Sequence, residues 1–131
     1  MRLIEELILV YNADAGLVSA LIDSGKKVLT LNGCTLCAIT HGIAGERAEW
    51  QECKTTFGVP IRYFHRDDLP AEVQAVTGGR LPCVIARVEG AYELLLTPES
   101  LERCNGKVAD LKRRLRHNAA LKGMSLPAAR G

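Results

Sequence analysis

A continuous apolar run near the start of the chain, LILVY at residues 7–11, limits the folds open to this protein. Apolar residues without polar alternation, followed by the turn residues NADAG, indicate a strand buried on both faces of a sheet. The next stretch, AGLVSALIDSGKK, repeats apolar residues at helical spacing until Gly25: Leu17, Val18, Leu21 and Ile22. A buried strand followed by a helix predicts a right-handed crossover to a second, parallel strand.

Three further segments continue this alternation of helices and strands. GERAEWQECKTTFG predicts an amphipathic helix, because Ile43, Trp50 and Phe57 recur at seven-residue intervals before Gly58 ends it. VPIRYFHRDD predicts the second strand of the crossover. LPAEVQAVTGG predicts a short helix that opens at Pro70.

The last third of the chain predicts a hairpin and a closing helix. LPCVIARV and AYELLLT are two strands joined at Glu89 and Gly90, and Pro98 opens a helix that we expect to run to about residue 118. This order favours an α/β fold with a four-stranded mixed sheet, one parallel βαβ crossover plus a C-terminal β-hairpin, covered by helices on both faces. We expect a single domain over residues 1–118 and a loose tail over residues 119–131.

Composition favours a cytoplasmic protein that binds neither membranes nor nucleic acids. The chain is 47% apolar and 24% charged, and no apolar run approaches the roughly 18 residues that a membrane span needs. Glu5 and Glu6 interrupt the apolar start, where a signal peptide would need an unbroken apolar core. The net charge of +2 is too small to indicate nucleic acid binding. KVADLKRRLRHNAALKG carries Leu111 and Leu115, which is typical of an amphipathic helix with a solvated basic face.

The segment GGRLPCVIARVEGAYELLLTPESLERC resembles the second half of the thioredoxin-like fold. In that fold a proline precedes a strand, a Gly-containing turn joins it to the edge strand, and a helix closes the domain. The resemblance implies a cis peptide bond between Leu81 and Pro82, and it implies that Pro82 and Cys83 border the active site. One feature departs from the pattern. The CxxC motif of thioredoxin-like enzymes directly follows the first strand, whereas this chain has NADAG there.

Five cysteines are many for a cytosolic chain of this length: Cys34, Cys37, Cys53, Cys83 and Cys104. Closely spaced cysteines in a reducing compartment more often bind metal or carry out redox chemistry than form structural bridges. The stretch NGCTLCAITHG contains two of them, with a histidine four residues after the second. Cys53 and Cys104 fall on predicted helices, where we expect buried core residues.

Two geometries are open for this stretch. Asn32-Gly33 is a strong hairpin signal, and alternating strand side chains would then point Cys34 and Cys37 to opposite faces. A helix that begins at Cys34 would instead bring Cys37 and His41 within about 60° of it, on one face. The second geometry makes chemistry possible, because amides at a helix start favour the thiolate and a nearby histidine can tune it.

Two functions follow from the helical geometry. In the first, the pair is the dithiol of a thiol-disulfide oxidoreductase that uses no cofactor and acts on a protein thiol or disulfide: Cys34 attacks and Cys37 resolves the mixed disulfide. His41 would tune the thiolate, and Pro82 with Cys83 would line the site. In the alternative, a non-enzymatic zinc-binding or interaction module, Cys34, Cys37 and His41 are three of four zinc ligands. A third reading is a small adaptor without chemistry.

A closer resemblance covers residues 7 to 70. CTLCAITHG, followed by Glu49-Trp50 and His65-Arg66-Asp67, is similar to the signature Cys-x-Leu-Cys-x-Ile/Leu-Thr-His/Tyr-Gly of a small bacterial family of uncharacterised proteins, some of them labelled GTPases. That family has His or Tyr at the position of His41, which favours the thiol function over a metal ligand there. The resemblance implies that several positions form one feature: the cysteine pair, Thr40, Gly42, Trp50 and Arg66-Asp67.

The GTPase label has no support in the motifs of this chain. A P-loop needs GxxxxGK[ST] between a strand and a helix, so that backbone amides cradle phosphates while Lys and Ser/Thr reach the terminal phosphate and magnesium. The nearest match, from Gly16 to Gly25-Lys26-Lys27, has eight intervening residues, lacks the Ser/Thr and puts its lysine after a helix. We therefore do not expect nucleotide hydrolysis.

Polar residues follow both predicted parallel strands, at the edge where open α/β sheets bind ligands. Asp14 comes after the first strand, and we expect it to cap the following helix. His65 to Asp68 follow the second strand and could bind an anion or a metal ion, but we expect Asp67 or Asp68 to cap the next helix and Arg66 to pair locally.

Overall fold

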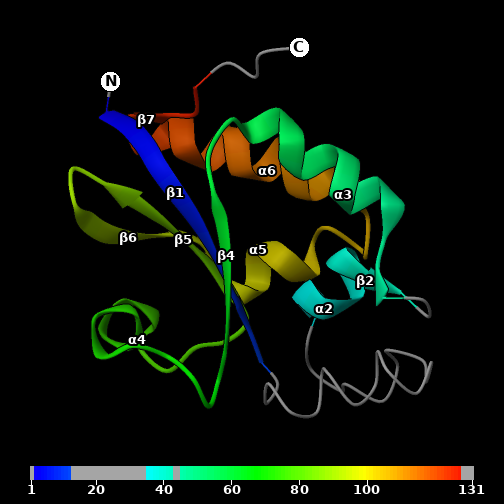
Figure 1. Ribbon diagram of the computed structural model, residues 1–131, viewed down its shortest axis with the longest axis horizontal. Coiled ribbons are helices and arrows are strands. Elements are labelled where there is room, and N and C mark those ends of the chain that lie inside the picture. Colours follow the sequence, from blue (N-terminus) through cyan, green and yellow to red (C-terminus); the bar gives the residue numbers. More distant parts are fainter. Residues whose placement is uncertain (1, 13–34, 43–44, 128–131) are drawn as a thin grey trace.

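The computed structural model describes residues 2–12, 35–42 and 45–127 (Figure 1). At positions 35, 37, 38, 41, 42, 45 and 46 the description covers the backbone and not the side chain. The helix expected at residues 15–25 and the expected cap Asp14 lie outside the described residues. The described part is an α/β fold built on a mixed sheet.

Strand β1 (Arg2–Tyr11) lies inside the sheet, whose main strands follow the order β4-β1-β5-β6. One neighbour, β4 (Ile61–His65), runs parallel to β1. The other neighbour, β5 (Cys83–Val88), runs antiparallel to β1, and β6 (Ala91–Leu96) pairs antiparallel with β5. The α/β class and the mixed sheet, with a parallel pair and a hairpin, are confirmed.

A fifth strand, β7 (Met124–Ser125), pairs in parallel with the start of β1. Arg2 donates its backbone N–H to the Gly123 carbonyl at 2.9 Å and its Nη2 to the Lys122 carbonyl at 2.8 Å. The sheet therefore has five strands instead of the expected four. Residues 124–125 belong to it and are not a loose tail. A strand of two residues is too short to show a periodicity in the sequence.

The closing helix is divided in two, α5 (Pro98–Glu102) and α6 (Val108–Leu121). The prediction of one helix to about residue 118 is wrong. Between the two, Asn105 and Gly106 have positive φ values of 52° and 72°, which no α-helix interior can contain. The dipeptide Asn-Gly is itself a turn signal, and that prediction did not take it into account.

Helices cover both faces of the sheet (Figure 1). On one face α4 (Ala71–Thr77) packs through Val73 against a small apolar cluster from the strands: Ile8, Val10, Cys83 and Ile85. Side chains alternate along a strand, so Tyr11 of β1 faces the opposite side from Val10. Each face therefore has its own core.

The second face carries the larger core, under α2 (Thr35–Thr40), α3 (Ala48–Lys54), α5 and α6. Trp50 of α3 is fully buried there, on the apolar face of the predicted amphipathic helix. After α3 a 3-10 helix over Thr55–Phe57 ends at Gly58, whose φ of 70° is left-handed, so the predicted helix stop is confirmed. On α6, Leu111 and Leu115 are fully buried, which confirms an amphipathic helix.

Among the described residues, no helix has both the length and the apolar character needed to cross a membrane.

Candidate functional site

The second cysteine of the CxxC motif lies in a helix. Cys37 is the third residue of α2, so residues 35–40 are not a strand and the hairpin geometry is wrong for them. Cys34 lies outside the described residues, and the side chain of Cys37 is not described. The helical alternative is thus the one that this segment adopts.

His41 does not continue that helix. It begins β2 (His41–Gly42), which pairs antiparallel with β3 (Gly45–Glu46). The expectation that His41 shares a helical face with Cys34 and Cys37 assumed an unbroken helix, and it is wrong because α2 ends at Thr40. The side chain of His41 is not described, so its part in any chemistry stays a prediction.

Buried hydrogen bonds tie α2 to the carboxyl end of β1. The Tyr11 hydroxyl lies 2.8 Å from Thr40 Oγ1, which lies 3.2 Å from the carbonyl oxygen of Leu36. Because Thr40 donates its single hydroxyl proton to that carbonyl, Tyr11 is the donor to Thr40. Leu36, Ile39 and Thr40 are all completely buried. The helix that carries Cys37 is therefore fixed against the last residue of β1.

Arg47 holds the end of α2 from the other side. Its backbone N–H donates to the Thr40 carbonyl at 2.8 Å, and its Nη1 donates to the carbonyl oxygens of Ile39 at 3.2 Å and Gly106 at 2.7 Å. Its Nη2 pairs with Glu49 Oε1 at 3.1 Å. Carbonyls at a helix end lack intrahelical partners, so a cation stabilises them. One guanidinium thus joins α2 to the turn between α5 and α6.

An aromatic row continues from Tyr11 along the same face of the sheet. The rings of Tyr11 and Tyr63 stack with their centroids 5.9 Å apart. The Tyr63 hydroxyl accepts a hydrogen bond of 3.0 Å from Trp50 Nε1. Sequence reasoning did not find this row, because its members come from β1, β4 and α3 and meet only in the folded chain.

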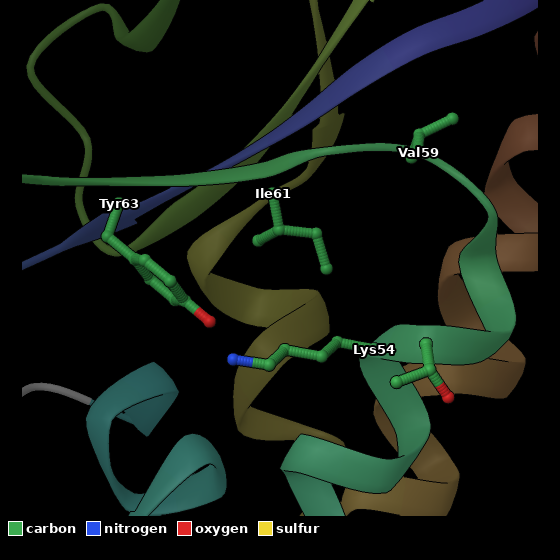
Figure 2. A pocket seen from close by; sticks show the side chains of 5 residues that line it. Lys54, Val59, Ile61 and Tyr63 are labelled. Atoms are coloured by element: carbon green, nitrogen blue, oxygen red, sulfur yellow. The ribbon is translucent and has the colours of Figure 1, made fainter.

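An open pocket of about 250 Å³ lies beside this row, and Figure 2 shows its lining. The Lys54 amine extends towards Tyr63, with Nζ 5.9 Å from the ring centroid. The pocket therefore combines one cation with a largely apolar wall, lined in full by Lys54, Thr55, Val59, Ile61 and Tyr63.

His65 and Asp68 form a pair at the carboxyl end of β4. His65 Nδ1 lies 3.0 Å from Asp68 Oδ2, and Asp68 Oδ1 accepts the backbone N–H of His65. The imidazole ring lies against Tyr11, with the centroids 5.6 Å apart. Asp68 was expected to cap the next helix, but the N-cap of α4 is Pro70 and no side chain caps that helix. The His-x-x-Asp spacing was the available sequence signal for this pair.

Leu81-Pro82 is a cis peptide bond, as the thioredoxin-like resemblance implied, and it directly precedes β5. Pro82 is buried. Cys83 is completely buried in the core beneath α4, beside Val10, and burial raises the pKa of its thiol to about 12. Its side chain therefore lies across the sheet from α2. The expectation that Cys83 lines a site with the α2 segment is not met, because neighbouring strand side chains alternate between the faces.

The other two described thiols are also buried core groups. Burial raises the pKa of Cys53, although Lys112 and Arg116 act in the opposite direction. Burial likewise raises the pKa of Cys104, whose Sγ–H donates to the Ser100 carbonyl at 3.5 Å. Cys53 and Cys104 are thus core residues, as predicted, and both are poor thiolates at neutral pH.

Within residues 2–12, 35–42 and 45–127, there is no group of three or more His, Cys, Asp or Glu side chains that could bind a metal ion. Cys34 lies outside those ranges, and the side chains of Cys37 and His41 are not described. The zinc set of Cys34, Cys37 and His41 therefore stays a prediction.

Comparison with protein-family models, with curated proteins and with solved structures gives no match.

Proposed function

We propose that this protein is a cytoplasmic thioredoxin-like thiol-disulfide oxidoreductase that acts through Cys34 and Cys37. The observation that carries the proposal is the attachment of α2 to the end of β1 through the bond between Tyr11 and Thr40. The CxxC motif follows β1 at a distance in the sequence, yet the helix that contains Cys37 is bonded to the last residue of that strand. This contact between α2 and the end of β1 supports the thioredoxin-like assignment, although the CxxC motif does not directly follow β1 in the sequence.

Two features of the sheet support a thioredoxin-like fold. The order β4-β1-β5-β6, with β4 parallel to β1 and the β5-β6 hairpin antiparallel, has the strand directions that the resemblance implies. The cis bond before Pro82 also lies where that fold has a proline, directly before the antiparallel strand. β7 is an addition to this arrangement.

The thiols outside the motif support the choice of the pair. Cys53, Cys83 and Cys104 are buried, and burial raises the pKa of each, so none supplies a thiolate readily. Exchange needs a thiolate that a bulky disulfide substrate can reach. We therefore assign the reaction to the remaining two cysteines, Cys34 and Cys37.

The reaction balances without a cofactor. The Cys34 thiolate attacks one sulfur of a protein disulfide, and the other sulfur leaves as a thiolate and takes up a proton. Cys37 then attacks Cys34 in the mixed disulfide, which releases the second substrate thiol and oxidises the pair to a disulfide. Two electrons pass from the dithiol to the substrate. In this proposal, His41 tunes the Cys34 thiolate and Pro82 lines the site.

The test is turnover of a protein disulfide by the reduced chain, with dithiothreitol as the terminal reductant. We expect Cys34→Ser to abolish turnover and Cys37→Ser to accumulate a mixed disulfide. Cys53→Ala is the matched control, because it removes a buried thiol, and we expect it to retain turnover. Equal turnover by the wild type and the double Ser variant would contradict the proposal.

Metal content separates the redox function from the zinc-binding alternative. We expect protein purified without added zinc to contain no zinc and to show two thiols that oxidise reversibly. If the protein contains about one zinc per chain and unfolds when a chelator removes it, the motif is a structural zinc site. That result would overturn the redox proposal.

A further inference from the structure

The turn between α5 and α6 presents an asparagine followed by a glycine. Asn105 is exposed and has a φ of 52°, and Gly106 follows it with a φ of 72°. A backbone hydrogen bond of 2.9 Å, from the Lys107 N–H to the Cys104 carbonyl, closes the turn around them. Residues 105 and 106 therefore lie outside both helices, and the asparagine side chain is accessible to water.

Neither the backbone amide of Gly106 nor the side chain of Asn105 is firmly held. Among the residues that the structure describes, none accepts a hydrogen bond from the Gly106 N–H. Apart from its chain neighbours, no heavy atom lies within 4 Å of the position that a Cβ at Gly106 would occupy. Asn105 Nδ2 donates only a long hydrogen bond of 3.4 Å, to the Arg103 carbonyl. Because glycine lacks a Cβ, the backbone between the two groups can rotate freely.

This turn has the groups needed for an intramolecular attack on the Asn105 side chain. The Gly106 amide nitrogen loses its proton and attacks Asn105 Cγ, and the side-chain amide leaves as ammonia. A water molecule then opens the cyclic imide at one of its two carbonyls. Opening at the former main-chain carbonyl gives isoaspartate, and opening at the former side-chain carbonyl gives aspartate. No electrons are transferred, and a neutral amide is replaced by a carboxylate.

The carbonyl of the same glycine contacts the arginine that holds α2. Arg47 Nη1 donates to the Gly106 carbonyl at 2.7 Å and to the Ile39 carbonyl, near the end of α2, at 3.2 Å. Isoaspartate routes the main chain through its own Cβ and Cγ, which inserts one more bond of about 1.5 Å before Gly106. N–H···O hydrogen bonds extend only to about 3.2 Å, so a displacement of this size breaks the contact with Arg47.

We infer that Asn105 is a site of spontaneous deamidation, and that its isoaspartate product breaks the contact between Arg47 and Gly106. The end of α2 then loses this link to the α5–α6 turn, while the bond between Tyr11 and Thr40 is kept. Deamidation accumulates with time, so the loosened α2 is a property of aged molecules. This inference does not depend on the proposed function, because neither the modification nor its readouts involve disulfide exchange.

Peptide mapping by mass spectrometry of folded protein incubated at pH 8 tests the site. We expect a mass gain of one dalton and isoaspartate-specific fragments at Asn105. Asn118 is the internal control, because it lies in α6, and it should react at least about 10-fold more slowly since the helix must first open. Mapping is needed instead of the total mass, because Asn32-Gly33 contains the same dipeptide.

The unfolded chain in urea shows whether the fold permits the reaction. If Asn105 deamidates in urea but not in the folded protein, the fold protects it and the inference is wrong. Asn105→Gly is the resistant variant, because glycine accepts the φ of 52° and has no side-chain amide to lose. It should melt like the fresh wild type and should not change on incubation.

Hydrogen exchange of the α2 backbone tests the link to Arg47. Protein with isoaspartate at position 105 should exchange faster than fresh protein over residues 36–42. Its melting temperature should fall by roughly 3–5 °C, as expected when a domain of this size loses one hydrogen bond. Asn105→Asp has the new charge without the extra backbone bond, so it should exchange like the fresh wild type. Equal exchange of modified and fresh protein would overturn the link, as would faster exchange in Asn105→Asp.

Arg47→Gln removes the contact before the modification occurs. In this background, isoaspartate at position 105 should cause no further change in the exchange of α2 or in the melting temperature. A full additional effect would show that the modification acts through another contact, and the role of Arg47 would be wrong. Should Arg47→Gln not fold, the comparison of the modified wild type with Asn105→Asp still decides.

Discussion

Neighbouring residues of β1 reach two very different environments. Val10 faces α4 and lies in an apolar cluster with Cys83, where burial raises the pKa of the thiol to about 12. Tyr11, one position later, faces α2 and contacts the hydroxyl of Thr40 and the ring of His65. The same end of one strand therefore supports an inert apolar face and a face rich in hydrogen-bonding groups. Chemistry at this edge of the sheet is expected on the α2 face alone.

The largest expected effect comes from removing the apolar anchor on each face in turn. Leu36→Ala deletes a fully buried side chain of α2, and we expect a loss of about 3 kcal/mol in unfolding free energy, because the cavity refills only partly. It should also lower disulfide turnover, because α2 loses the buried side chain that packs it into the larger core. Val73→Ala on α4 should cost less stability and leave turnover intact. Urea unfolding and turnover measure both; a similar loss of turnover in both variants would contradict the separation of the faces.

A smaller effect concerns the buried thiol at high pH. The folded pKa of Cys83 is raised to about 12 from its ordinary value of 9.0, so the folded state holds the proton more tightly than the unfolded state. The stabilising contribution is complete below pH 9 and is lost as the pH rises towards 12. Between pH 9 and 10 we expect the wild type to lose up to about 1.4 kcal/mol more stability than Cys83→Ala. Identical pH slopes for the two proteins would show that Cys83 ionises normally.

The smallest expected effect is the loss of one hydroxyl on the α2 face. Tyr11→Phe removes the donor to Thr40 and should cost about 1 kcal/mol, the usual contribution of one hydrogen bond. Tyr92→Phe on β6 is the matched control, because Tyr92 packs against the α4 cluster, and its cost should be close to zero. Thermal melting of both variants tests the difference. Equal costs would mean that the Tyr11 hydroxyl does not hold α2.

Local signals explain which elements the sequence predicted. Local turn residues and apolar runs were enough to predict three features: the hairpin at Glu89 and Gly90, the helix stop at Gly58 and the parallel strand β4. β7 and the division between α5 and α6 were missed. β7 depends on pairing with Arg2 and Leu3 at the other end of the chain, and no local pattern reports such pairing.

The candidate site shows the same limit. The CxxC spacing identified the cysteine pair, but neither spacing nor composition indicated that Tyr11 would bond Thr40, or that Arg47 would reach Gly106. These contacts join residues that are far apart in the sequence. Cys83 was expected beside the pair because it follows Pro82, but it is the first residue of β5 and its side chain lies in the apolar cluster under α4. In a strand, a shift of one residue changes the face.

The pairing of β7 with the start of β1 has a consequence for how the protein is made. The first described residues of the chain hydrogen-bond to residues 122–125, so the sheet is complete only after those late residues have left the ribosome. Until then, the amino end of β1 has its β7 side exposed to other chains, and such an exposed strand edge is prone to aggregation. A nascent chain that stalls before residue 124 therefore has an unpaired strand edge at the amino end of β1.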